Sequence, residues 1–341
     1  MKRWTIGLLL LIPLAVTAWA QGGGSTELLY VMNARSDFVS VIGIPDNKVV
    51  GQIRIGRGGS GIAANRQGTR LYVAVESGPK VLAIDTLTSQ VLWSVPVGET
   101  PHHVALSGDG RYLYVCVFSS NRLDIVDTET RSVIGSVRVG FQPHNVYTSR
   151  DGKRIYSGQI GQDNIAVVDV ATQEVVKMVN LPDKVRPIAF TPDERYAYVQ
   201  LSRLHGFVRV DLKTDERVTI NLPPTTKPMP TTWPYNVVHG IEVSPDNKYV
   251  FADSVLDNYI AVYTIPDHKL VKTIPVGSSP NWLAFSADGQ TLYVSNRGDN
   301  NVSVISVRDL KELNRVPVGE GPQRILNVRV PTGRVSFTSQ N

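Results

Sequence analysis

Three of the six histidines of this chain occupy one equivalent position in a unit that recurs along the sequence. His102, His144 and His239 each stand twelve residues before the tyrosine or phenylalanine of a strand-like segment. Imidazoles that converge on one point suit a metal ion when they are neutral, or an anion when they are protonated. This position is therefore the first place to look for chemistry.

The same position is polar in every unit. We expect ligand binding by the residues at this position together with two from the position that follows: Ser60, His102, His144, Arg186, His239, Asn281 and Gln323, then Trp282 and Arg324. Three interpretations are open: a metal or haem held by the three histidines, an anionic or aromatic small ligand held by histidine and arginine, or a ring of water-bonded residues. Strand alternation predicts that His103, one residue after His102, points the other way.

A second candidate feature is an insertion of 11 residues within 224–238. It is rich in proline and carries Trp233 and Tyr235. Because insertions in repeat proteins map to one face, often the binding face, we expect a lid or a partner-contact loop over the polar position. A neutral insertion is the alternative.

The elements that position these residues follow from the repeat. Its aromatic landmark recurs with spacings of 42, 42, 42, 42, 53 and 42 residues, at Tyr30, Tyr72, Tyr114, Tyr156, Tyr198, Phe251 and Tyr293. Each unit holds four short runs rich in β-branched residues, separated by turn signals such as Asp109-Gly110. Four strands per unit of about 40 residues predict an all-β, seven-bladed β-propeller with four-stranded blades.

The ends of the chain fit a closed ring. The chain starts with the second strand of a unit, near Leu28, and ends with a first strand at 323–330. We expect these segments to pair in one blade, which removes the exposed edges of an open array. The propeller is thus expected over 28–330, after a linker at 21–27 and before a tail at 331–341.

The segments Leu292-Tyr293-Val294-Ser295-Asn296 and Val302-Ser303-Val304-Ile305 resemble the YVTN-repeat propellers of bacterial exported and surface-layer proteins. A second match is Tyr30-Val31-Met32-Asn33 with Val39-Ser40-Val41-Ile42. The resemblance implies the fold and leaves the function open, since the family hosts binding, scaffold and accessory roles. The chain is more distantly similar to the propellers of methylamine dehydrogenase and haem-d1 nitrite reductases, and this similarity makes cofactor chemistry conceivable.

The first twenty residues predict a cleavable signal peptide. Lys2 and Arg3 precede an apolar run from Ile6 to Val16, and an A-x-A site ends at Ala20. We therefore expect cleavage after Ala20 and a periplasmic or secreted protein without a membrane span. The net charge of +5 is spread along the chain and gives no basic stripe for nucleic acid. A monomer is expected.

No contiguous catalytic motif, such as a nucleophile elbow, a phosphate-binding loop or a haem-attachment sequence, is present in the chain. The sequence therefore favours a non-catalytic propeller that binds a small ligand or a protein partner on its histidine-bearing face. The alternative is a propeller enzyme or cofactor accessory protein that uses His102, His144 and His239 with a metal, haem or quinone. A third possibility is a component of the cell envelope.

Overall fold

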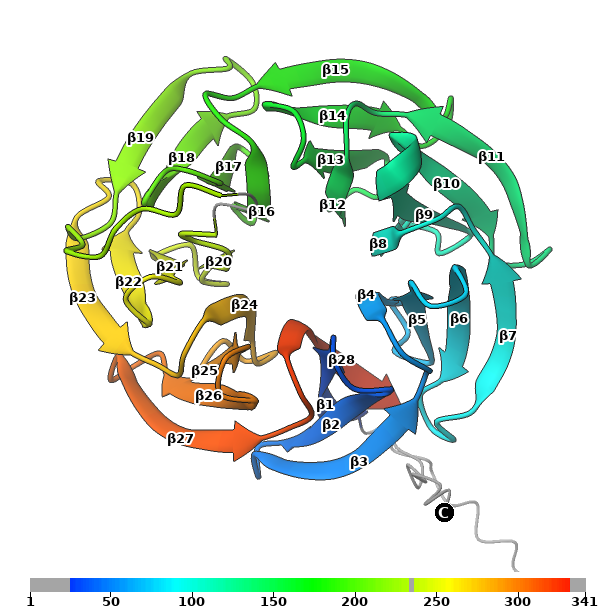
Figure 1. Cartoon of the computed structure of the whole chain (residues 1–341), viewed down its shortest axis with the longest axis horizontal. Helices are drawn as coiled ribbons and strands as arrows, with labels where there is room; N and C mark the ends of the chain where they lie inside the picture. Colours follow the sequence, from blue (N-terminus) through cyan, green and yellow to red (C-terminus); the bar gives the residue numbers. More distant parts are fainter. Residues whose placement is uncertain (1–24, 233–235, 332–341) are drawn as a thin grey trace, which may run out of the picture.

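The computed structural model describes residues 25–232 and 236–331. Seven four-stranded antiparallel sheets surround a central channel as blades (Figure 1). The predicted seven-bladed propeller is confirmed. Within the described residues the one helical element is the 3₁₀ turn η1 (Phe118–Ser120), and no helix there is long and apolar enough to cross a membrane.

Each blade runs from an inner strand at the channel to an outer strand at the rim (Figure 1). Blades 1 and 2 contain β28 (Pro322–Pro331), β1 (Ser25–Asn33), β2 (Phe38–Ile44) and β3 (Lys48–Arg54), then β4 (Gly59–Ala64), β5 (Arg70–Val75), β6 (Lys80–Asp85) and β7 (Val91–Pro96). Blades 3 and 4 contain β8 (Pro101–Leu106), β9 (Tyr112–Val117), β10 (Arg122–Asp127) and β11 (Ser132–Arg138), then β12 (Pro143–Thr148), β13 (Arg154–Gln159), β14 (Asn164–Asp169) and β15 (Glu174–Asn180).

The later blades repeat this order. Blade 5 contains β16 (Val185–Phe190), β17 (Tyr196–Leu201), β18 (Gly206–Asp211) and β19 (Arg217–Asn221). Blades 6 and 7 contain β20 (Ile241–Val243), β21 (Tyr249–Ser254), β22 (Tyr259–Thr264) and β23 (Leu270–Pro275), then β24 (Pro280–Phe285), β25 (Thr291–Asn296), β26 (Asn301–Ser306) and β27 (Lys311–Pro317).

The ring closes as predicted. β1 pairs antiparallel with β28, with Leu28 opposite Val328 and Tyr30 opposite Leu326. β1 begins at Ser25, slightly before the expected start of the propeller, and β28 ends at Pro331. The predicted linker and signal peptide up to residue 24 lie outside the described residues.

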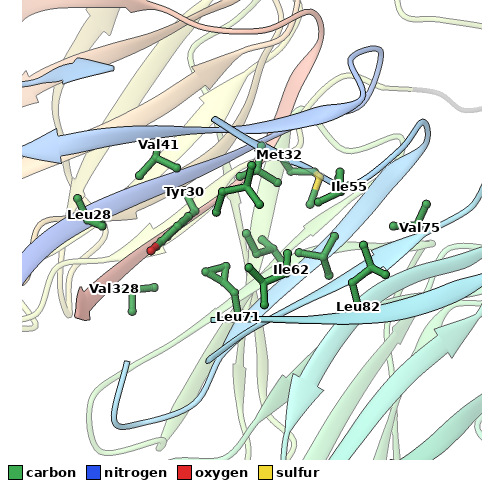
Figure 2. Packing of buried hydrophobic residues seen from close by; sticks show 14 of the residues in the cluster. Leu28, Tyr30, Met32, Val41, Ile55, Ile62, Leu71, Val75, Leu82 and Val328 are labelled. Carbon is green, nitrogen blue, oxygen red and sulfur yellow. The ribbon is translucent and has the colours of Figure 1, made fainter. Parts of the chain in front are cut away.

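The aromatic landmarks lie in the apolar layers between blades, where all seven are buried. Figure 2 shows one such layer, in which Tyr30 and Met32 of β1 face Leu71 and Val75 of β5. Fully burying a large apolar side chain stabilises a fold by about 1.5–3 kcal/mol. Because each layer joins two neighbouring blades, the landmark position holds the ring together around the channel.

The start of the inner strand is irregular in six blades. In β4, β8, β12, β16, β24 and β28 the ladder to the second strand shifts by one residue at this point, which is a β-bulge. Bulges redirect side chains and often lie beside functional sites. The bulge occupies the polar position identified in the sequence, so it determines what faces the channel.

Candidate active site

A cavity of about 400 Å³ opens at the end of the channel where the inner strands begin. Six of the nine predicted ligand-binding residues, from five blades, line it: His102, His144, Arg186, His239, Gln323 and Arg324. The structure adds residues from neighbouring loops and strand ends, among them Arg35, Glu76, Phe118, Asn236 and Arg297. The aligned position thus gathers polar side chains at one opening, which we call the mouth cavity.

The other three predicted residues support the mouth cavity from behind. Ser60 is buried and its hydroxyl donates a hydrogen bond to the Pro101 carbonyl at 2.6 Å. The backbone carbonyl of Asn281 lies 2.6 Å from His239 Nδ1. Trp282 lies deeper in the channel, where its ring faces the Arg324 guanidinium at 5.1 Å.

The three histidines come together as neighbours. The ring centroids of His102 and His144 are 4.9 Å apart, and those of His144 and His239 are 6.3 Å apart. Within residues 25–232 and 236–331, no group of three or more His, Cys, Asp or Glu residues is arranged to hold a metal ion. The geometry therefore gives a cluster of imidazoles rather than a tetrahedral ligand set.

His103 differs from the prediction. It lines the channel below the mouth, with its ring 5.4 Å from the Trp282 ring of blade 7, across the axis from its own strand in blade 3. The bulge between Pro101 and Val104 interrupts the alternation on which the prediction rested.

The imidazoles are neutral in the folded protein. Burial, together with the Arg324 charge, lowers the pKa of His102 to about 3. Burial likewise holds the pKa values of His144 and His239 well below their usual range, with nearby arginines adding to the effect. His144 Nδ1 is buried and has no hydrogen-bond partner in the described part of the chain. Neutral imidazoles can accept protons, and a negative charge placed beside them would raise their basicity.

Arginine dominates the charge of the mouth cavity. Arg186 and Arg324 are each 3 % exposed, and burial lowers the pKa of both guanidinium groups only to about 10, so both stay charged. Arg186 Nε donates to Ser202 Oγ at 3.0 Å, and Arg324 Nη1 donates to the Ser60 carbonyl at 2.5 Å. Arg35 and Arg297 add two more charges at the exposed rim. Such a cavity favours an anion.

Glu76 is the one carboxylate among the described residues that line the mouth cavity. Its Oε1 lies 3.7 Å from His102 Nδ1. Burial raises the pKa of Glu76, and Arg324 partly offsets this effect. A carboxylate beside one ring nitrogen orients an imidazole and stabilises its protonated form, which leaves Nε2 to exchange a proton with a ligand.

Asp253 fixes the backbone that carries His239. Its two carboxylate oxygens accept hydrogen bonds from the backbone N–H groups of His239 at 2.6 Å and Gly240 at 2.7 Å. In this blade β20 starts only at Ile241, so Asp253 replaces the missing part of the strand ladder. A Cβ added at Gly240 would overlap Leu283 Cδ1 and lie 3.0 Å from Asp253 Oδ2, so both neighbours favour the glycine. Burial raises the pKa of Asp253 to about 7.

The inserted loop reaches the mouth cavity through Asn236, which lines it. Further back, Thr225 Oγ1 donates to Asp257 Oδ1 at 3.1 Å, and Lys227 Nζ lies 3.8 Å from the same atom. These contacts fasten the insertion to the loop after β21. The predicted lid residues Trp233 and Tyr235 lie outside the described residues, so their role stays a prediction.

The neutral histidines predict an acid-sensitive fold. The folded pKa of His144 lies below its unfolded value of about 6.5, so its contribution to stability is present above that pH and is lost as the pH falls. His144→Gln removes this proton uptake. Thermal unfolding between pH 7.5 and 5 should show the variant losing about 1 kcal/mol per pH unit less than the wild type below pH 6.5. Identical slopes would contradict a buried, neutral His144.

Comparisons with known proteins identify a family and several similar structures. Residues 49–322 match the family model described as "Lactonase, 7-bladed beta-propeller". A comparison with curated protein sequences finds no match. Among solved structures, the periplasmic gluconolactonase of Pseudomonas aeruginosa is similar with a TM-score of 0.71 and 20 % identity, over 90 % of this chain and 100 % of that chain.

Two further structures share the fold. A putative 6-phosphogluconolactonase from Bacteroides uniformis has a TM-score of 0.72 and 17 % identity, covering 89 % of this chain and 99 % of that chain. Hydrazine synthase of Kuenenia stuttgartiensis has a TM-score of 0.73 and 20 % identity, covering 82 % of this chain and 92 % of that chain. At these identities the likeness shows the seven-bladed fold.

The family match corrects one prediction. The sequence favoured a non-catalytic binding scaffold, and this is wrong, because the family that the chain matches is one of lactonases. The absence of a contiguous motif misled the interpretation, since the polar groups of the mouth cavity come from different blades. The YVTN resemblance is confirmed as far as the seven-bladed propeller, while the matching family model is the lactonase one. The chain belongs to the family of seven-bladed β-propeller lactonases.

Proposed function

We propose that this protein hydrolyses a sugar lactone to the open hydroxy acid at the mouth cavity. The observation that carries the proposal is the neutral His102 beside Glu76, in a cavity that also holds the Arg186 and Arg324 charges. Lactone hydrolysis needs a base for water and positive charge for the developing oxyanion. Both requirements are met within this one cavity.

In the proposed reaction a water molecule attacks the lactone carbonyl carbon. His102 Nε2 takes a proton from the water, while Glu76 stabilises the resulting imidazolium through Nδ1. The carbonyl oxygen becomes an oxyanion, and guanidinium charge stabilises it. When the ring C–O bond breaks, the leaving oxygen takes the proton from His102, and the product is a hydroxy carboxylic acid that ionises in water. Burial and the Arg324 charge keep His102 weakly basic, and the charge on the oxyanion raises its basicity as the reaction proceeds.

The Pseudomonas relative is named a periplasmic gluconolactonase, and the Bacteroides structure a putative 6-phosphogluconolactonase. By analogy we propose an aldonolactone, with or without a phosphate, as the substrate. The arginine-rich rim favours an anionic product and would also accept a phosphate group. We further propose that the protein works in the periplasm after cleavage at Ala20, which the mass of the exported protein tests. We also propose that the repeat is of the YVTN type and that the protein is a monomer.

The test is a pH-stat assay with D-glucono-1,5-lactone and its 6-phosphate. Acid release by the purified protein, after subtraction of spontaneous hydrolysis, should follow saturation kinetics. His268→Gln is a suitable control, since His268 lies in the hairpin between β22 and β23 and contacts Tyr198 rather than the mouth cavity. A rate equal to spontaneous hydrolysis for both lactones would overturn the proposal.

Asp253 should act as a positioning residue. Asp253→Asn puts an amide NH₂ opposite one backbone N–H, so we expect a loss of about 1–3 kcal/mol in the free energy of unfolding and a lower kcat. Asp124→Asn is the matched control, because Asp124 is also buried and accepts a backbone N–H, that of Gly98, at 2.8 Å away from the mouth cavity. Equal kcat losses in the two variants would contradict a specific role of Asp253.

A further inference from the structure

The inner strands divide the channel into layers. The first layer holds the polar residues of the mouth cavity. One residue further along the strands, His103, Trp282 and Arg324 meet near the axis: the Trp282 ring lies 5.4 Å from the His103 ring and 5.1 Å from the Arg324 guanidinium carbon. Arg324 lines the mouth cavity and also a second cavity beyond this layer. The three side chains therefore separate two compartments.

The second cavity exists because small side chains occupy most of the inner-strand positions around it. Three residues after the polar position the aligned side chains are mostly alanine, at positions 63, 105, 189 and 284, and the exceptions are Tyr147, Glu242 and Leu326. Three of these alanines and all three exceptions line a space of about 800 Å³ at the end of the channel opposite the mouth. This volume is twice that of the mouth cavity and lies within the range of small-molecule sites.

Glu242 gives this cavity a specific polar group. It is a half-buried carboxyl on β20, and burial raises its pKa to about 8, so it is protonated at neutral pH and can donate a hydrogen bond. Tyr147 stands on the neighbouring wall, where its hydroxyl accepts a hydrogen bond from the Ile188 N–H at 3.1 Å. The other titratable or charged groups that line the cavity are His103, Arg66, Asp109, Arg150, Arg324 and Tyr147 itself.

The charges argue for an uncharged occupant. Arg324 is already engaged, since its terminal nitrogens donate to the Ser60 carbonyl and to Asn145 Oδ1, and its plane faces Trp282. Arg150 is bonded to the Pro192 carbonyl at the exposed rim. Arg66 also lies on the exposed rim, away from the interior of the cavity. A cation in the interior would face the Arg324 charge, and a neutral ligand avoids this without needing a free counter-charge. Apolar walls with one convergent donor instead suit a ring with a single acceptor.

We propose that this second cavity is a binding site for an uncharged, ring-shaped small molecule whose carbonyl, ether or hydroxyl oxygen accepts a hydrogen bond from Glu242. The site is independent of the lactone chemistry proposed at the other end of the channel. It would place a second ligand on the far side of Arg324, which lines both cavities.

The probe for the test is 4′-fluoroacetophenone, an uncharged ring with one carbonyl, followed by ¹⁹F NMR titration of the full protein. We expect saturable binding at pH 6.5 that weakens about ten-fold at pH 9.5, because ionised Glu242 has no proton to donate. Glu242→Gln keeps an N–H donor and should bind equally at both pH values. D-Gluconate, an anion, should not displace the probe.

Ala284→Phe places an aromatic ring in the cavity and should weaken binding of the probe at least ten-fold without changing the rate of lactone hydrolysis. If this variant does not fold, Ala63→Phe narrows the same space from blade 2, and thermal unfolding shows which variant is folded. Unchanged affinity for the probe in a folded variant with the narrowed cavity would overturn the proposal, as would displacement by gluconate. Absence of saturable binding to the wild type would overturn it too.

Discussion

His102→Gln should lower kcat for lactone hydrolysis by about 10²–10⁴-fold, the usual contribution of a general base. The side chain keeps a polar group of similar length but cannot take a proton from water. KM should change little, because the neutral imidazole contributes little to ground-state binding. The measurement is a pH-stat assay of kcat and KM at several pH values, with thermal unfolding to confirm an intact fold.

Two comparisons make this result specific. His268→Gln removes a histidine whose Nε2 lies 3.0 Å from the Tyr198 hydroxyl, away from the mouth cavity, and should leave kcat unchanged. Glu76→Gln keeps the shape of the neighbour of His102 but removes its charge, so it should lower kcat less than His102→Gln does. A His102→Gln variant with normal kcat would exclude the imidazole as the base.

Arg186→Met should lower kcat/KM by about 10²–10³-fold, since removing one group that stabilises an oxyanion typically has this effect. Arg186→Lys should recover part of the loss, because a point charge replaces only some of the guanidinium contacts. Arg308→Met is the control. Arg308 is exposed and paired with Asp309 on the surface.

The same variant has a second readout. The Arg186 charge helps to lower the pKa of His239 and of His144, after the larger effect of burial. Arg186→Met should therefore raise both histidine pKa values, which NMR titration of the imidazole protons would detect. A loss of activity without a rise of these pKa values would contradict the effect of the Arg186 charge on the two imidazoles.

Much of the fold could be predicted because the repeat is regular. Seven buried aromatic residues, separated by 42 residues in five of the six intervals, determine seven blades, and the half-blades at 28–33 and 323–330 can only complete each other. The convergence of His102, His144 and His239 follows from the same alignment, since equivalent positions in a closed ring face one axis. Regular geometry turns sequence register into spatial proximity.

The rest of the site could not be predicted from the polar position of the repeat alone. Glu76 and Arg297 lie four residues after the aromatic landmark, directly after the second strand of their blades. The same position in other units brings Ala34, Phe118 and Ile160 to the mouth cavity. The direction of His103 depends on a bulge, and the division of the channel depends on the volumes of Trp282 and Arg324. Neither is visible in a pattern of polar and apolar residues.

The most direct test of lactone hydrolysis at the mouth cavity is a crystal structure of the protein with D-gluconate, the product of the proposed reaction. We expect the gluconate carboxylate in the mouth cavity, hydrogen-bonded to Arg186 and adjacent to His102, with no gluconate in the second cavity. Gluconate bound only in the cavity lined by Glu242 would contradict the account. A mouth cavity that stays empty in crystals that hydrolyse the lactone would do the same.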